Sequence, residues 1–340
     1  MLSKKRHNLI WGLAVLVTVA CTDGRARVTT TVFSSVDSPE TSLQLVADVQ
    51  SKDGATGNAV STNALQMFIK GTSLFMTGTP FMFARWELGQ DMENPMPTFE
   101  GNKKLTNFTA MGAWPVDSYA SGAVTTYGNT AFMSGMSGTS VISMAETMNP
   151  KEIQRYPLAS PQGIPITQED YTYTAMVTHP TKPIIYAFKR QDYLYTLDLS
   201  SGTVKIGAKD AYGSSGQSVC CVMGAAVLQN KIFVAFRDRL LVFEIGSDGR
   251  LINPKEATDI NAVNVVATPR YVYVQHEPTS SPTAGSARPS GIYVLDSSIK
   301  NVGFFKASSP RRFAVSQDDT HFYSNLEGTR VKIFRILWTN

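Results

Sequence analysis

The sequence is poor in the residues that build metal and redox centres. Its 340 residues include three cysteines and four histidines, and 17% are charged. So few sulfur and imidazole ligands leave little material for a metalloenzyme, and we predict no metal site and no cofactor. Without residues 4–6, which we expect to be cleaved off, 28 basic residues face 27 acidic ones. A nearly neutral charge gives no basis for binding nucleic acid.

Long helical patterns are also lacking, because the chain from Thr41 onward has only short apolar runs. Apolar residues nevertheless make up 43% of the sequence, which is enough for a sizeable core and excludes wholesale disorder. The 25 glycines and 17 prolines are typical of a chain with many turns. This composition favours an all-β protein over a helical bundle.

The first 20 residues have the pattern of a secretory signal peptide. Three basic residues at 4–6 precede an apolar run from Leu9 to Ala20. That run is short for a membrane-spanning helix, which needs about 20 apolar residues. We therefore expect residues 1–20 to be removed.

Residues 17–21, Val-Thr-Val-Ala-Cys, resemble the lipobox of bacterial lipoproteins. The resemblance implies that the Cys21 thiol receives a diacylglycerol and that the chain is cut before it. Thr18 departs from the pattern, which usually has Leu there, and an ordinary secreted protein is the alternative. Thr22 in place of Asp implies an outer-membrane lipoprotein, in the periplasm or on the cell surface. Several acyl chains would hold the protein stably at the membrane.

A polar segment follows the lipobox. Residues 21–40 are rich in Thr, Ser and Arg and have no sustained apolar period. We expect a flexible tether from the lipidated cysteine, with a span of roughly 25 Å. Residues 41–340 then form one folded domain.

This domain repeats a unit of four expected strands. Six short apolar runs have starts that are separated by 57, 54, 47, 40 and 49 residues. Further expected strands precede and follow each run, and the fourth strand is more polar, as in Ile153–Tyr156. The runs are Ser73–Met76, Thr130–Met133, Ile184–Ala187, Lys231–Val234, Tyr271–Val274 and Thr320–Tyr323.

An Asn-Pro pair follows the expected third strand in three units. Proline fixes φ and lacks an amide donor, so we expect each pair to form a turn. Recurrence at equivalent places supports a repeat protein. The pairs are Asn94-Pro95, Asn149-Pro150 and Asn253-Pro254.

Repeated four-strand units of this length are typical of β-propeller blades. The last unit reaches the chain terminus with its third strand, Arg330–Ile336, so an N-terminal run, Ser42–Val46, would supply its fourth and close the ring. We predict an all-β propeller of six four-stranded antiparallel blades. Seven blades are the alternative if residues 27–50 form more than one strand. A pair of β-sandwiches is less favoured, because sandwiches need not repeat at this period.

Two segments resemble YVTN and lactonase-type propellers. Thr178–Tyr186 carries a His-Pro pair before an apolar strand, and Leu241–Leu251 is similar to the strand and turn that follow in that family. The Asn-Pro turns are similar to LVIVD-type repeats of secreted bacterial propellers. These resemblances imply the fold and transfer no catalytic residue to this chain.

His179, His276 and His321 are the histidines beyond the signal peptide, each near a strand end in a different unit. Imidazole near neutral pH can act as an acid or a base. No Asp or Glu recurs beside the three, so structural roles are favoured.

Cys220 and Cys221 are the only thiols left after lipidation of Cys21. In an oxidising compartment they could form a vicinal disulfide, which would stiffen a loop or be redox-active. The ring is strained and neighbouring side chains of a strand point to opposite faces, so buried free thiols are the alternative.

Ten of the thirteen methionines lie between Met67 and Met148. Pairs such as Met133 and Met136 could offer thioethers to Cu(I), as could Met144 and Met148. Packing of an irregular core explains the same residues without a metal and is favoured.

Several polar features lie outside the expected strands. Arg311-Arg312 lies at the start of the last unit. The polar, Pro- and Ser-rich composition of Thr279–Pro289 predicts a long loop on one face, where binding residues usually lie. Asp210 and Asp318-Asp319 lie at turns, with too few clustered oxygens for a calcium site.

We predict an outer-membrane lipoprotein, anchored through Cys21, whose propeller binds a protein or a small ligand on one face. A lactonase-like hydrolase at the channel mouth is the first alternative, and a redox or metal-handling envelope protein is the second. The lack of a catalytic constellation favours binding over catalysis and leaves an enzymatic activity open. Carboxylates and histidine converging at one channel end would favour the enzyme.

Overall fold

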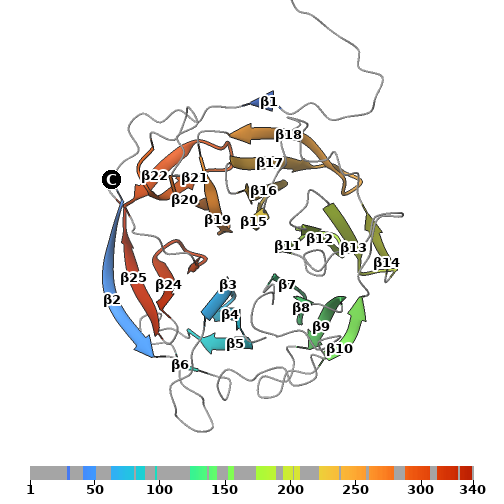
Figure 1. The fold of residues 1–340 in the computed structure, drawn as a ribbon, viewed down its shortest axis with the longest axis horizontal. Coiled ribbons are helices and arrows are strands. Elements are labelled where there is room, and N and C mark those ends of the chain that lie inside the picture. Colours follow the sequence, from blue (N-terminus) through green and yellow to red (C-terminus); the bar gives the residue numbers. More distant parts are fainter. Residues whose placement is uncertain are drawn as a thin grey trace, which may run out of the picture.

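The protein is built from β-strands (Figure 1). In the residues that the computed structural model describes, there are 25 strands in six sheets and no helix, in agreement with the predicted all-β class. No segment of this part of the chain is therefore a helix fit to cross a membrane. The described residues are 29–30, 41–50, 63–79, 82–88, 96–97, 123–135, 138–143, 152–156, 174–188, 194–201, 203–206, 222–236, 239–257, 260–278, 288–306, 312–327 and 330–338.

Each of the first three sheets is a meander of four antiparallel strands that follow one another in the chain. The first sheet contains β3 (Asn63–Lys70), β4 (Ser73–Thr79), β5 (Met82–Glu87) and β6 (Met96–Pro97). The second contains β7 (Val124–Tyr127), β8 (Thr130–Gly135), β9 (Gly138–Ser143) and β10 (Glu152–Tyr156). The third contains β11 (Ala175–Thr178), β12 (Ile184–Phe188), β13 (Leu194–Asp198) and β14 (Thr203–Ile206).

The other three sheets follow the same plan, and two of them include an N-terminal strand. The fourth contains β15 (Val222–Leu228), β16 (Lys231–Phe236), β17 (Arg239–Ile245) and β18 (Leu251–Ala257), with β1 (Thr29–Thr30) beside β18. The fifth contains β19 (Ala262–Ala267), β20 (Val272–His276), β21 (Gly291–Leu295) and β22 (Asn301–Phe305). The sixth contains β23 (Phe313–Val315), β24 (His321–Glu327), β25 (Arg330–Leu337) and β2 (Ser42–Gln50).

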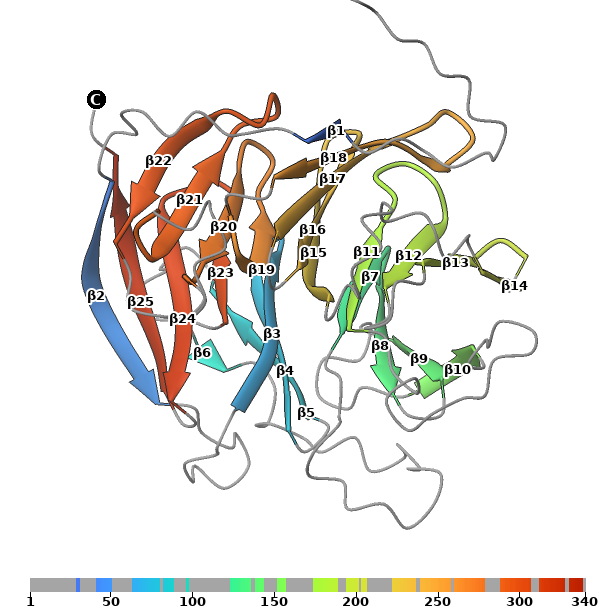
Figure 2. The same ribbon diagram turned by 45° about the horizontal axis from the view of Figure 1, so that its top comes forward.

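The sheets stand around a common centre with their first strands innermost (Figure 1), and Figure 2 shows the same strands in an oblique view. Among these inner strands, β11 contacts β7 and β15, β19 contacts β15 and β23, and β23 contacts β3. Side chains of β3 also bond to the second sheet, through Gln66 and Lys70. Neighbouring sheets therefore meet along their inner edges.

The hydrophobic cores lie between neighbouring sheets. Separate clusters join the third sheet to the fourth, the fourth to the fifth and the fifth to the sixth. Met67 and Leu74 of the first sheet pack with Tyr323 and Ile333 of the sixth. Because both faces of a sheet are covered, β20 and β21 are buried along their whole length. This explains why the predicted apolar runs, which are the second strands, are continuous rather than alternating.

The N-terminal strand β2 lies at the outer edge of the sixth sheet. It pairs antiparallel with β25 from Ser42↔Leu337 to Gln50↔Arg330, so the pairing that the sequence predicts for this segment is present. The short strand β1 falls within the predicted tether and pairs in parallel with β18. The rest of residues 21–40 lies outside the described part of the chain.

The prediction of a turn at Asn253-Pro254 is wrong. Both residues lie inside β18, where the pairing with β17 shifts register between Val242 and Glu244. Asn253 adopts a φ of 50°, and its Nδ2 donates to Glu244 Oε2 at 2.7 Å. A β-bulge accommodates proline, which has no amide N–H to donate to the neighbouring strand. Asparagine tolerates the left-handed region better than most residues. The other two Asn-Pro pairs lie outside the described residues.

The short turns that join first to second strands and third to fourth strands lie at one end of the sheets, here called the turn end. Equivalent lysines link neighbouring sheets at this end. Lys182 Nζ of the third sheet donates to Ser247 O of the fourth, and Lys231 Nζ of the fourth donates to Ser297 O of the fifth. These bonds satisfy turn carbonyls and fix one sheet against the next.

A buried polar cluster joins the fifth and sixth sheets at the turn end. Tyr273 OH donates to Asp319 Oδ1 at 2.8 Å, and Trp338 Nε1 donates to the main-chain oxygen of Asp319 at 3.0 Å. Arg270 Nε lies 3.9 Å from Asp319 Oδ2. Asp319 is fully buried, and this burial raises the pKa of its carboxyl above the ordinary value.

Candidate functional site

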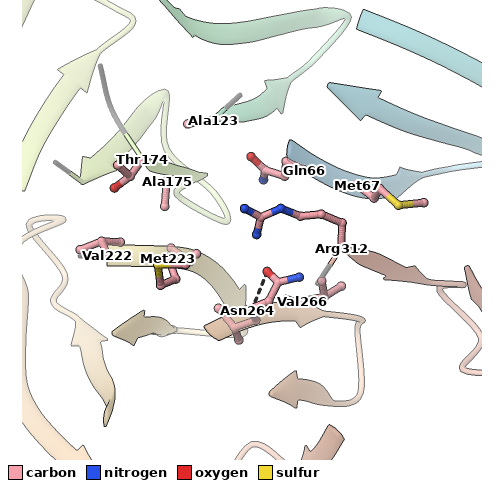
Figure 3. Close-up of a pocket in the computed structure, with 13 residues that line it drawn as sticks. Gln66, Met67, Ala123, Thr174, Ala175, Val222, Met223, Asn264, Val266 and Arg312 are labelled. Carbon is pink, nitrogen blue, oxygen red and sulfur yellow. Dashed lines mark hydrogen bonds between the residues drawn. The ribbon is translucent and has the colours of Figure 1, made fainter. Parts of the chain in front are cut away.

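A cavity opens at the opposite end of the sheets, here called the mouth end, where the innermost strands begin (Figure 3). Its volume is about 190 Å³, and all six sheets contribute to its wall. The contributions include Gln66 of β3, Ala123 before β7, Thr174 before β11, Met223 of β15, Asn264 of β19 and Arg312 before β23.

A second cavity, of about 240 Å³, continues between the innermost strands toward the turn end. The two cavities share Gln66, Met67, Ala225, Val265 and Val266 in their walls. Hydroxyl groups also occur deeper inside, where Thr125 Oγ1 and Thr178 Oγ1 share a hydrogen bond of 2.8 Å between β7 and β11. The cavities together follow the centre of the molecule, and most of the described residues that line them are apolar.

Gln66 joins the first two sheets at the cavity wall. Its Nε2 donates to Val124 O at 3.1 Å, and its Oε1 accepts from Val124 N at 2.9 Å. The amide thus takes the place of a neighbouring strand along the open edge of β7, whose main-chain groups need partners. Because both ends of the amide are engaged, Gln66 is a fixed part of the wall.

Three innermost strands change register where they reach the cavity. A β-bulge adds one residue to a strand and redirects the side chains that follow. The shifts fall between Ala64 and Gln66, between Val222 and Gly224, and between Ala262 and Asn264. The residue after each shift lines the cavity, so the bulges help to build the mouth.

Gly224 and Asn264 lie close together in this wall. A Cβ atom at position 224 would come within 3.1 Å of Asn264 Oδ1, so glycine leaves room for the amide. Asn264 Oδ1 also accepts from Val265 N at 2.9 Å. The fourth and fifth sheets therefore approach closely beside the cavity.

Arg312 reaches into the cavity from the start of the sixth sheet. Its main-chain oxygen accepts a hydrogen bond of 3.2 Å from Asn325 N, which holds its backbone against β24. Figure 3 shows its guanidinium group between the side chains of Gln66 and Asn264. Among the described residues that line either cavity, Arg312 is the only charged one. The mouth combines one positive charge with a mainly apolar wall.

The three predicted histidines lie apart from one another and outside the described lining of the cavities. Each Nδ1 is hydrogen-bonded within its own sheet, which is a structural role. Burial also lowers the pKa of His179. The partners are Thr181 N and Lys182 N for His179, Asn261 N for His276 and Thr320 Oγ1 for His321.

Other predicted site residues lie outside the described part of the chain. These include Cys21, Cys220 and Cys221, so the lipid anchor and the vicinal disulfide stay predictions. Where side chains are described, no three of His, Cys, Asp and Glu gather as a metal ion would require. Of the methionines proposed to bind Cu(I), Met136, Met144 and Met148 are outside the described residues, and the side chain of Met133 is not described.

From the sequence, Arg312 is expected only at the start of the last unit, and Gln66 and Asn264 are not predicted to line a site. Both amides follow the second or third residue of an innermost strand, within otherwise apolar segments. An alignment of the units on their first strands, rather than on the apolar second strands, would have put Gln66, Gly224 and Asn264 at one position.

Comparisons with known proteins support the fold alone. No protein-family model and no curated protein matches this chain, so the resemblance to YVTN, lactonase-type and LVIVD propellers stays a prediction. The WD40 domain of Neurospora crassa Pan2 is similar in structure, with a TM-score of 0.50 and 12% identity over 88% of this chain and 96% of that one. This likeness shows a β-propeller-type fold.

Two further solved structures are similar at lower scores. PorZ, a surface component of the type-IX secretion system of Porphyromonas gingivalis, has a TM-score of 0.45 and 12% identity over 76% of this chain. The present chain spans only 29% of the PorZ chain. Myxococcus xanthus glutaminyl cyclase has a TM-score of 0.42 and 8% identity, over 89% of this chain and 100% of that one.

Proposed function

We propose that the six sheets are the blades of a six-bladed propeller whose ring β2 completes. Contacts between successive inner strands support this arrangement. So does the core that the first and sixth sheets share. The pairing of β2 with β25 would then tie the beginning of the domain to its last sheet.

On this fold, the protein acts as a binding scaffold with its ligand site at the mouth end. The observation that carries this proposal is the cavity into which all six sheets converge. Ligand sites are typically concave and mainly apolar, with a few placed polar groups. Arg312 and Asn264 are such groups on an otherwise largely apolar wall.

Blocking the mouth tests this site. Thr174 lines the cavity, and its Oγ1 donates to Phe188 O at 3.2 Å. Thr174→Phe would fill the opening, so a small probe that binds the full-length wild type should bind at least tenfold more weakly. The probes are benzoate, benzamide and cyclohexanol, followed by ligand-observed NMR.

Thr130→Phe is the matched control, because Thr130 Oγ1 makes the same kind of bond, to Tyr127 O at 2.7 Å, at an exposed place. This variant should bind the probes like the wild type. Met223→Trp, which fills the mouth from another sheet, guards against a folding defect of Thr174→Phe. The site is refuted if no probe binds the wild type or if both filled variants bind normally.

Anchoring at the outer membrane through Cys21 is part of the same proposal. The signal-peptide and lipobox patterns support it. With β1 paired to β18, only residues 22–28 would connect Cys21 to the folded body, a reach of at most about 27 Å. Cys21→Ala should release the protein from membranes, whereas Cys220→Ala should leave it there. A Cys21→Ala protein that still sediments with membranes would contradict the anchor.

A further inference from the structure

We propose that the mouth cavity binds a small carboxylate with a compact apolar body, and that Arg312 holds the carboxylate. This inference rests on the proposed ligand site at the mouth and adds the chemical class of the ligand. It begins from the charge of the lining, in which Arg312 is the only ionisable side chain among the described residues.

Arg312 is suited to a carboxylate. A guanidinium group is planar and permanently charged, and it pairs with a carboxylate through two parallel hydrogen bonds. It also carries five N–H donors, so it can keep a contact within the protein and still bind a ligand. Figure 3 shows the group directed into the cavity between walls from other sheets. A carboxylate bound there would lie near the centre of the mouth.

Neighbouring polar side chains of the cavity wall are hydrogen-bonded within the protein. Both ends of the Gln66 amide hold the main chain of Val124, and the Thr174 hydroxyl holds Phe188 O. Among the described lining residues, Arg312 supplies one positive charge, so a monoanion matches it better than a phosphate dianion, which would bring a second negative charge into the cavity.

The rest of the lining determines the body of the ligand. Met67, Ala175, Val222, Met223 and Val266 give the cavity an apolar wall. Its volume of about 190 Å³ is of the size that holds a single ring, because an apolar cavity of about 150 Å³ accepts benzene. A six-membered ring with one carboxylate satisfies both the charge and the size.

Benzoate and benzamide differ only in the charged group, so they test this inference directly. The full-length wild type should bind benzoate at least tenfold more tightly than benzamide in an NMR titration, and added salt should weaken only benzoate. Arg312→Met keeps a long apolar side chain without charge. It should lose this preference, with benzamide binding changed less than twofold.

Two further variants complete the test. Arg250→Met removes an arginine at the turn end, where the side chain is 86% exposed, and should leave both affinities unchanged. Arg312→Lys keeps the charge but lacks the planar guanidinium group, so its preference for benzoate over benzamide should lie between those of the wild type and Arg312→Met. This second variant at the same position also guards against a folding defect of Arg312→Met.

The possible failures can be told apart. Equal affinity for benzoate and benzamide, or benzoate preference that survives Arg312→Met, would overturn the carboxylate inference. The mouth site would still stand if Thr174→Phe blocked both probes. Benzoate binding that both mouth-filling variants leave intact would overturn the site together with the inference.

Discussion

The two ends of the sheets differ in what their polar side chains do. At the turn end, Lys182 and Lys231 donate to carbonyl groups of the next sheet, and Tyr273 donates to the buried Asp319. At the mouth end, Arg312 is directed into a cavity. Polar groups at the turn end link neighbouring sheets, whereas the guanidinium group of Arg312 at the mouth end faces a cavity.

This difference has a physical origin in the connections. The described turns at one end are short, such as residues 229–230 between β15 and β16, so side chains and turn carbonyls of neighbouring sheets come close. The strands that flank residues 157–173 and 207–221 have their nearest ends at the mouth end, and these two segments lie outside the described residues. Stability and binding can then be changed separately by substitution.

The largest expected effect is a loss of stability at the turn end. Tyr273→Phe removes the hydroxyl that donates to the fully buried Asp319 and leaves that carboxyl without this bond. Hydrogen bonds to charged groups contribute about 1.5–3 kcal/mol, so we expect a decrease of about 2 kcal/mol in the free energy of unfolding. Urea denaturation followed by fluorescence measures it.

Controls from both ends make this result specific. Tyr271→Phe removes an exposed hydroxyl two residues away, which accepts from Arg270 Nη2 at 3.1 Å, and should cost less than about 0.5 kcal/mol. Arg312→Met at the mouth should cost less than Tyr273→Phe, although it abolishes the carboxylate preference. Equal destabilisation by Tyr273→Phe and Arg312→Met would break the distinction between the two ends.

A pH dependence follows from Asp319. Its burial raises the pKa of the carboxyl above 3.8, so the folded chain holds the proton more tightly than the unfolded chain. The contribution to stability is complete below about pH 4 and is lost as the pH rises through the folded-state pKa. Asp319→Asn lacks this titration, so its stability relative to the wild type should increase as the pH is raised above about 4.

Asp198 provides the comparison for that experiment. This turn carboxylate accepts hydrogen bonds from Ser200, which lower its pKa to about 2. The contribution of Asp198 to the stability of the folded chain is present above about pH 4 and is lost as the pH falls toward about 2. A difference between Asp319→Asn and wild type that does not change with pH above about 4 would show that Asp319 does not titrate as its burial implies.

The smallest expected effect concerns the lysine links. Lys231→Met keeps the apolar stem but removes the donor to Ser297 O, and we expect a loss of about 0.5–1 kcal/mol. Lys306→Met, at an exposed position of the fifth sheet, should change stability less. If the two variants unfold alike, the link between the fourth and fifth sheets does not depend on Lys231.

Much of the fold could be predicted from the sequence, because covered sheets leave continuous apolar second strands such as β16. The expected pairing of an N-terminal run with the last unit is present as the pairing of β2 with β25. Asn253-Pro254 was misread because proline in a chain usually marks a turn, and a bulge with a left-handed asparagine is not visible in a pattern of alternation.

The candidate site was harder to predict for the same reason. Gln66 and Asn264 line the cavity after register shifts, and a shift changes the face to which every following side chain points. Arg312 stands before its strand, where periodicity carries no information. Convergence of residues from six separate sheets depends on how the sheets are placed around the centre, so only the three-dimensional arrangement reveals it.

Amide hydrogen exchange with and without benzoate is the most direct test of a ligand site at the mouth end. Such a site predicts slower exchange at the starts of β15 and β19, which line the mouth, and unchanged exchange in the turns at 246–250 and 296–300. Protection confined to those turns, or the same exchange everywhere with benzoate bound, would contradict a binding site at the mouth end.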